Sequence, residues 1–149
     1  CLPHVTAVSD PMTIREFSRR FLCASASHED VRHAMLLPAA SNIYYATSSV
    51  GIGGRAVCYR YSAPLSNMLQ HVEFIDLQWT RRREENEPPP YDPVQPPVLR
   101  PMMRPYGLHK LDWFDVENIS TGFVSDAAGY NSTIWIDAER ELYYYYWTD

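Results

Sequence analysis

Hydrophobic positions near the start of the chain follow the spacing of a helix. Ile14, Phe17 and Phe21 recur at intervals of three and four residues, which places them on one helix face. An Asp-Pro pair just before them supplies an N-cap and a proline suited to the first helical position. The pattern predicts a helix over residues 11–24.

A second helical pattern follows. A Ser-x-x-Asp capping motif begins at Ser27, apolar residues then recur on one face, and Pro38 ends the run. We expect a helix over residues 28–37. The two helices are predicted to form an N-terminal pair that packs against the rest of the domain.

From residue 41 onward the spacing becomes that of strands. Residues 42–50 and 55–62 are rich in β-branched and aromatic side chains and are separated by Gly-Ile-Gly-Gly, which predicts a hairpin. Those glycines do not form a phosphate-binding loop, because neither Lys-Ser/Thr nor a helical pattern follows them. Residues 71–79 alternate in two phases, so a further strand with a β-bulge near residues 74–75 is predicted.

The C-terminal residues 132–147 read as another hairpin, STIWID and LYYYYW around a polar turn. Tyr144 alternates with Tyr143 and Tyr145, so aromatic side chains occupy both strand faces and neither face is simply solvated. One face should pack on the core and the other against something else. The fold class is therefore α+β: the helical pair on a mostly antiparallel sheet of five or six strands.

Between the strand patterns lies EENEPPPYDPVQPPVLRPMMRP, residues 84–105, with eight of the chain's twelve prolines. Prolines remove backbone donors and favour extended geometry, so no central strand or helix is expected there. The part up to Asp92 is acidic and should be exposed, whereas residues 94–103 hold five apolar side chains and should lie against a surface. We expect a long extended arm within a single domain of 149 residues.

Composition limits the classes of function. The chain is 46% hydrophobic and 21% charged, as in globular proteins, and its net charge of −5 comes from the residues after Pro105. No basic face is evident, so nucleic-acid binding is not expected. No apolar run reaches the length of a membrane span, and no motif indicates a cofactor. His28 and His33 are five residues apart, too far around a helix for a shared zinc ion.

Two sets of residues are candidates for catalysis. The chain begins at Cys1, and an N-terminal thiol activated by its own α-amine is the nucleophile of N-terminal nucleophile amidohydrolases, but no early Arg or Asp is present to orient it. Whether processing generates this end is left open. Asp112, Asp115 and Glu117 flank two aromatic residues, a combination found in sugar-binding or hydrolytic clefts. A charged outer face of a strand or turn explains the same carboxylates.

The cysteines and the glycosylation sequons bear on compartment. Cys23 and Cys58 could form one disulfide, or they could be buried thiols. Asn118 and Asn131 each begin an Asn-x-Ser/Thr sequon. These features slightly favour a secreted or particle-associated protein, and the compartment remains open.

Residues 88–91, Pro-Pro-Pro-Tyr, match the Pro-Pro-x-Tyr ligand of WW domains. A polyproline helix is already extended, so it loses little entropy on entering an aromatic groove. This match predicts a WW-type domain as one partner. The alternative is that the arm is a structural strap on its own domain or on a neighbouring subunit.

The leading hypothesis is a non-catalytic structural or interaction subunit of a larger assembly, such as a viral shell or a secreted particle. A hydrolase with an N-terminal Cys nucleophile and a secreted binding or toxin-like effector are the alternatives. The residues predicted to contact other protein subunits, in a homo- or hetero-oligomer, are Pro88, Pro89, Tyr91, Val98, Leu99, Met102, Met103, Tyr143, Tyr145 and Trp147.

Overall fold

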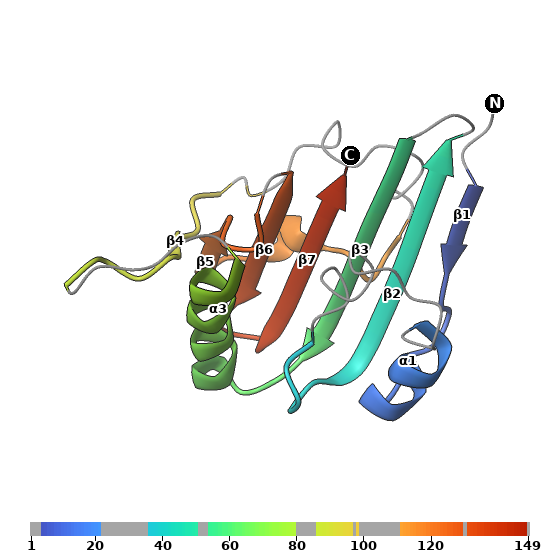
Figure 1. Ribbon diagram of the computed structural model, residues 1–149, viewed down its shortest axis with the longest axis horizontal. Coiled ribbons are helices and arrows are strands. Elements are labelled where there is room, and N and C mark those ends of the chain that lie inside the picture. Colours follow the sequence, from blue (N-terminus) through green and yellow to red (C-terminus); the bar gives the residue numbers. More distant parts are fainter. Residues whose placement is uncertain are drawn as a thin grey trace.

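The computed structural model describes residues 4–21, 36–50, 54–79, 86–96, 98, 111–129 and 131–148. Its strands form one antiparallel sheet in the order β1-β2-β3-β7-β6-β5-β4 (Figure 1). This confirms the predicted α+β class. The elements are β1 (His4–Ala7), α1 (Ile14–Phe21), β2 (Ser41–Val50), β3 (Gly54–Ser62), α3 (Leu65–Trp79), β4 (Asp92–Pro93), η3 (Val116–Asn118), β5 (Gly122–Ser125), β6 (Ser132–Asp137) and β7 (Leu142–Thr148).

Two hairpins form the centre of the sheet. β2 pairs with β3, and β6 pairs with β7, close to the residue ranges that the strand patterns predict. β3 and β7 then pair with each other and place Tyr59 opposite Tyr145 and Tyr61 opposite Tyr143. The four tyrosine rings stack on one face of the sheet, with centroids 4.8 Å apart for the first pair and 4.5 Å for the second. This stack joins the hairpins into one core.

Both faces of the sheet are covered. On one face α1 and α3 pack over a cluster that includes Tyr143 and Tyr145, and on the other the segment 111–119 packs over a cluster that includes Tyr144 and Tyr146. Figure 1 shows α3 in front of the strands and the orange segment containing η3 behind them. The four tyrosines of β7, residues 143–146, are therefore buried within this chain, on both faces of the strand.

The strand predicted over residues 71–79 is wrong, because these residues form the second half of α3. Met68, Val72 and Ile75 are buried at helical spacing against the sheet. Phe74 and Leu77, two of the apolar residues in the alternating pattern, are 48% and 54% exposed. A short apolar run with some alternation fits either element, and packing against the sheet favours the helix.

The turn between β6 and β7 stabilises the start of α3. The first helical N–H, of Leu65, donates to Oε2 of Glu141 at 2.8 Å, and the N–H of Ala63 donates to the Glu141 carbonyl at 3.3 Å. Pro64 lies between them, where a missing N–H costs little. A carboxylate at the positive end of the helix dipole is favourable, so a residue 76 positions along the chain serves as the helix cap.

α1 confirms the first helix pattern over residues 14–21 and begins three residues after the predicted start at residue 11. Its N–H at Glu16 donates to Oγ1 of Thr13 at 3.1 Å, so Thr13 caps the helix instead of the predicted Asp10. Phe17 is fully buried and meets Tyr45 edge to face at 5.3 Å. Residues 22–35 lie outside the described residues, so the helical pair stays a prediction.

Candidate functional site

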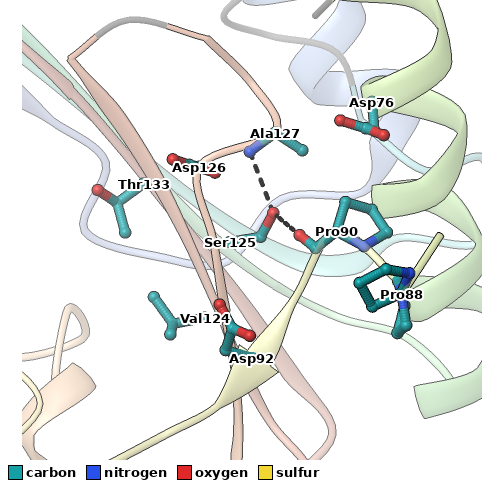
Figure 2. A pocket seen from close by; sticks show the side chains of 10 residues that line it. Asp76, Pro88, Pro90, Asp92, Val124, Ser125, Asp126, Ala127 and Thr133 are labelled. Carbon is teal, nitrogen blue, oxygen red and sulfur yellow. Dashed lines mark hydrogen bonds between the residues drawn. The ribbon is translucent and has the colours of Figure 1, made fainter. Parts of the chain in front are cut away.

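The structure describes residues 86–96 and 98 of the proline-rich segment, and within them Asp92–Pro93 form β4 and pair with β5 at the edge of the sheet. Oγ of Ser125 donates a hydrogen bond to the Pro90 carbonyl and accepts one from the N–H of Ala127 at 3.0 Å (Figure 2). The same serine thus ties the arm to β5 and shapes the turn that follows β5. The remainder of residues 84–105 lies outside the described part of the chain, so the arm as a whole stays a prediction.

Tyr91 and Val94 attach the arm to opposite faces of the sheet. The Tyr91 ring meets Phe123 of β5 edge to face, with centroids 5.2 Å apart, and packs on the core beneath α3. Val94 is buried in the cluster on the opposite face. The backbone between them forms β4. The segment therefore crosses the edge of the sheet and contributes one side chain to the core cluster on each face.

The pairing of β4 with β5 suits the residues involved. Pro93 lies opposite Phe123, between the hydrogen-bonded positions, where its missing N–H removes no ladder bond. The N–H of Val94 donates to the Gly122 carbonyl at 2.9 Å. A side chain at Gly122 would place its Cβ 1.9 Å from the Ile136 carbonyl oxygen, so only glycine allows this close approach of β5 and β6.

A groove of about 710 Å³ lies beside the arm. Its walls come from α3, the arm, β5 and the turn after β5. Figure 2 shows Asp76 on α3 and Pro88 and Pro90 on the arm around this space. Pro88 and Pro89 are exposed, and three carboxylates give the lining a negative character. The lining residues that matter for recognition are Asp76, Pro88, Pro89, Asp92, Ser125 and Asp126.

A separate polar cluster on the opposite face of the sheet centres on Asp115. Oδ1 accepts a hydrogen bond from Oη of Tyr144 at 2.6 Å and one from Arg60 at 3.4 Å. Oδ2 accepts one from Arg140 at 2.7 Å and one from Asn118 at 3.1 Å. The carboxylate thus holds the segment 111–119 against strands from both hairpins.

These contacts set the protonation of the cluster. Burial raises the pKa of Asp115, but the hydrogen bonds from Tyr144, Arg140 and Asn118 have the larger combined effect and lower it from 3.8 to about 2. Burial, together with the bond to Asp115, raises the pKa of Tyr144. Near neutral pH Asp115 is charged and Tyr144 is neutral, so neither is suited to proton transfer there. Their arrangement stabilises the fold.

The other predicted catalytic carboxylates, Asp112 and Glu117, are exposed on the same segment. Trp113 stacks on the Tyr44 ring of β2 at 5.4 Å, and Phe114 is buried, so the aromatics beside the carboxylates pack on the sheet. Sequence reasoning did not identify the partners of Asp115. Arg60, Tyr144 and Arg140 lie 55, 29 and 25 positions away, and no local pattern links them.

The remaining predicted residues divide into described and undescribed positions. Tyr143 and Tyr145 are buried, and Trp147 and Val98 are partly buried against the chain's own core clusters. Asn118 and Asn131 are exposed, and Cys58 is buried in β3, so the glycosylation and disulfide predictions stay predictions. Residues outside the described part are Cys1, Cys23, Leu99, Met102 and Met103.

Comparisons with protein families, with curated proteins and with solved structures find no match. Within the described residues, no helix combines the length and apolarity that a bilayer span requires. In the same part of the chain, no three His, Cys, Asp or Glu side chains gather closely enough to hold a metal ion. The groove beside the arm, with its exposed prolines and three carboxylates, is the candidate site.

Proposed function

We propose that this chain is a non-catalytic interaction subunit of a larger assembly and that its contact surface is the proline-rich arm with the groove beside it. The observation that carries the proposal is the exposure of Pro88 and Pro89 on an arm that is anchored only a few residues further on. Exposed prolines on a tethered, extended segment suit recognition by another protein.

The anchoring of the arm supports this reading. Hydrogen bonds and ring contacts at Pro90, Tyr91 and Val94 hold the segment to β5. Proline also limits the conformations open to the free chain. A partner that binds here meets a segment that has already lost much of its freedom, and a smaller entropy cost favours binding.

The ionisable side chains support a non-catalytic role. Asp115 accepts hydrogen bonds from four side chains and stays charged to strongly acidic pH. Burial raises the pKa values of Tyr59, Tyr61 and Tyr143, so these hydroxyls are poor proton donors near neutrality. These hydrogen bonds and buried hydroxyl groups serve to stabilise the fold, and the proposal therefore assigns recognition to the arm.

The C-terminal hairpin enters the proposal in a changed role. Tyr143 and Tyr145 are buried in the core of this chain, so the proposed contact surface does not include them. The hairpin instead pairs with β5 through β6, and β5 pairs with β4 of the arm. Three aromatic residues of this hairpin were predicted to contact a partner. Of these, Trp147 is partly exposed.

Site-specific photo-crosslinking tests the proposal. A photoreactive amino acid at position 86, an exposed residue next to the prolines, should form a covalent adduct in extracts of the source organism, and excess unmodified chain should suppress the adduct. A chain with Pro88→Ser and Pro89→Ser should suppress it less. Position 112 is the matched control, because Asp112 is also exposed but lies on the segment across the sheet.

Sedimentation of the purified chain over a range of concentrations reports self-association, so a second copy and a different partner are distinguished. The proposal fails if the chain remains monomeric and position 86 crosslinks no more specifically than position 112. Equal suppression by the wild-type and the doubly substituted chain would also refute it, because the prolines would then make no contribution to binding.

A further inference from the structure

We propose that residues 88–91 are a Pro-Pro-x-Tyr ligand for a WW-type domain and that contact between Tyr91 and Phe123 holds this ligand in a closed state. A partner then binds only when the tyrosine leaves Phe123. The inference rests on the proposed function, because it names the partner class of the same arm and the step that limits its binding.

The two halves of the motif differ in accessibility. Pro88 and Pro89 are exposed, whereas Tyr91 is half-buried. Consecutive prolines favour the extended polyproline geometry that an aromatic groove binds, and the chain bends at Pro90, between the two exposed prolines and Tyr91. The proline half of the ligand is thus available on the folded chain, and the tyrosine half is occupied.

Three contacts on one strand close the motif. Phe123 holds the Tyr91 ring edge to face at 5.2 Å. Ser125, two residues along β5, holds the carbonyl of Pro90. Behind them, the N–H of Val94 donates to the Gly122 carbonyl at 2.9 Å. The Tyr91 ring cannot contact Phe123 and a partner groove at the same time, so the intramolecular contact competes directly with the partner.

This competition has a measurable size. When only a fraction of the chain is in the binding-competent form, the apparent dissociation constant rises by the inverse of that fraction. An aromatic pair together with the apolar area it buries corresponds to a factor of about ten in an equilibrium constant. The folded chain should therefore bind about tenfold more weakly than the same residues in an unconstrained peptide.

The test is a titration of a purified WW domain that binds Pro-Pro-x-Tyr peptides. Its ligands are the full chain, the full chain with Phe123→Ala, and a synthetic peptide of residues 86–96, which needs no fold to act as a ligand. Phe123→Ala should tighten binding by about tenfold, to near the peptide's affinity. Tyr91→Ala should abolish binding. Phe74→Ala, which removes an exposed ring from α3, is the matched control and should change nothing.

A second variant covers the case in which Phe123→Ala disturbs the fold. Ser125→Ala removes the hydrogen bond to the Pro90 carbonyl and keeps the aromatic pair, so it should tighten binding by a smaller factor. Urea unfolding of each variant shows whether the sheet remains intact. Tighter binding by a folded Ser125→Ala chain supports the closed state, and unchanged binding contradicts it.

Each remaining outcome decides one part of the inference. Equal affinity of the chain and the peptide, or no gain on Phe123→Ala, overturns the closed state. Failure of the peptide to bind overturns the choice of a WW-type partner. Neither result removes the interaction function, because specific crosslinking from position 86 would still show that another protein contacts the arm.

Discussion

Tyr144 and Tyr143 are neighbours on β7 whose hydroxyl groups face opposite environments. Oη of Tyr144 donates to Asp115 at 2.6 Å and accepts from Arg140 at 3.0 Å. A hydrogen bond to a charged group contributes about 1.5–3 kcal/mol to stability. Asp115 keeps its bonds from Arg140 and Asn118 when the hydroxyl is removed, so Tyr144→Phe should lower the free energy of unfolding by about 2 kcal/mol.

Tyr143→Phe removes the same atom from the adjacent residue and is the matched control. Its hydroxyl is buried and has no hydrogen-bond partner among the described residues. Removing a buried hydroxyl that makes no hydrogen bond eliminates a desolvation cost, so this variant should be unchanged or more stable by up to about 1 kcal/mol. The two substitutions have the same effect on side-chain volume, which leaves hydrogen bonding as the difference.

Urea unfolding followed by tryptophan fluorescence measures both variants at pH 7 and at pH 2. The pKa of Asp115 is lowered from 3.8 to about 2 in the folded chain, so its stabilisation is present above pH 3.8 and is lost as the pH falls through 2. The deficit of Tyr144→Phe should therefore shrink at pH 2. The reasoning is refuted if both variants lose equal stability, or if the deficit of Tyr144→Phe is independent of pH.

Three further substitutions test other contacts. Asp115→Asn should lower the free energy of unfolding at pH 7 by about 1–2 kcal/mol in urea titrations, and the two chains should converge at pH 2; a constant difference would exclude the charge as the cause. Gly122→Ala should lower the free energy of unfolding by at least about 2 kcal/mol, because the new Cβ would collide with the Ile136 carbonyl. The midpoint of thermal unfolding should fall by several degrees. An unchanged midpoint would contradict the close approach of β5 and β6. Glu141→Ala removes the acceptor for the Leu65 N–H and should lower the free energy of unfolding, measured in urea titrations, by about 1 kcal/mol. If stability is unchanged, water caps α3 equally well.

The fold was predicted well where local pattern and tertiary environment agree. Both hairpins have strands that alternate or carry β-branched and aromatic residues, and such segments fit a pleated surface in many settings. The edge position of β4 also follows from its sequence, because Pro93 cannot donate within a central strand. The prediction failed at residues 71–79, where a two-phase alternation was interpreted as a bulged strand although the run begins at helical spacing from Met68.

The hydrogen-bonded cluster around Asp115 was less predictable. The Asp115 segment was identified by its carboxylates, but its chemistry depends on Arg60, Arg140 and Tyr144, which come from two hairpins. Without these partners the carboxylates were compatible with a hydrolytic cleft and with the charged outer face of a strand or turn. The fold shows that Asp115 is fully engaged in hydrogen bonds, because the antiparallel order of β3, β7 and β6 brings its donors to one place.

For the proline-rich segment, the sequence alone predicted an extended backbone, since proline restricts its own backbone wherever it occurs. Its acidic start and its apolar continuation were equally visible. Only the tertiary structure decided that Tyr91 meets Phe123 on one face of the sheet while Val94 is buried on the other. Proline geometry is a local property of the residue, whereas the surface against which an extended segment lies depends on strand order, and strand order is set by contacts between residues far apart in the chain.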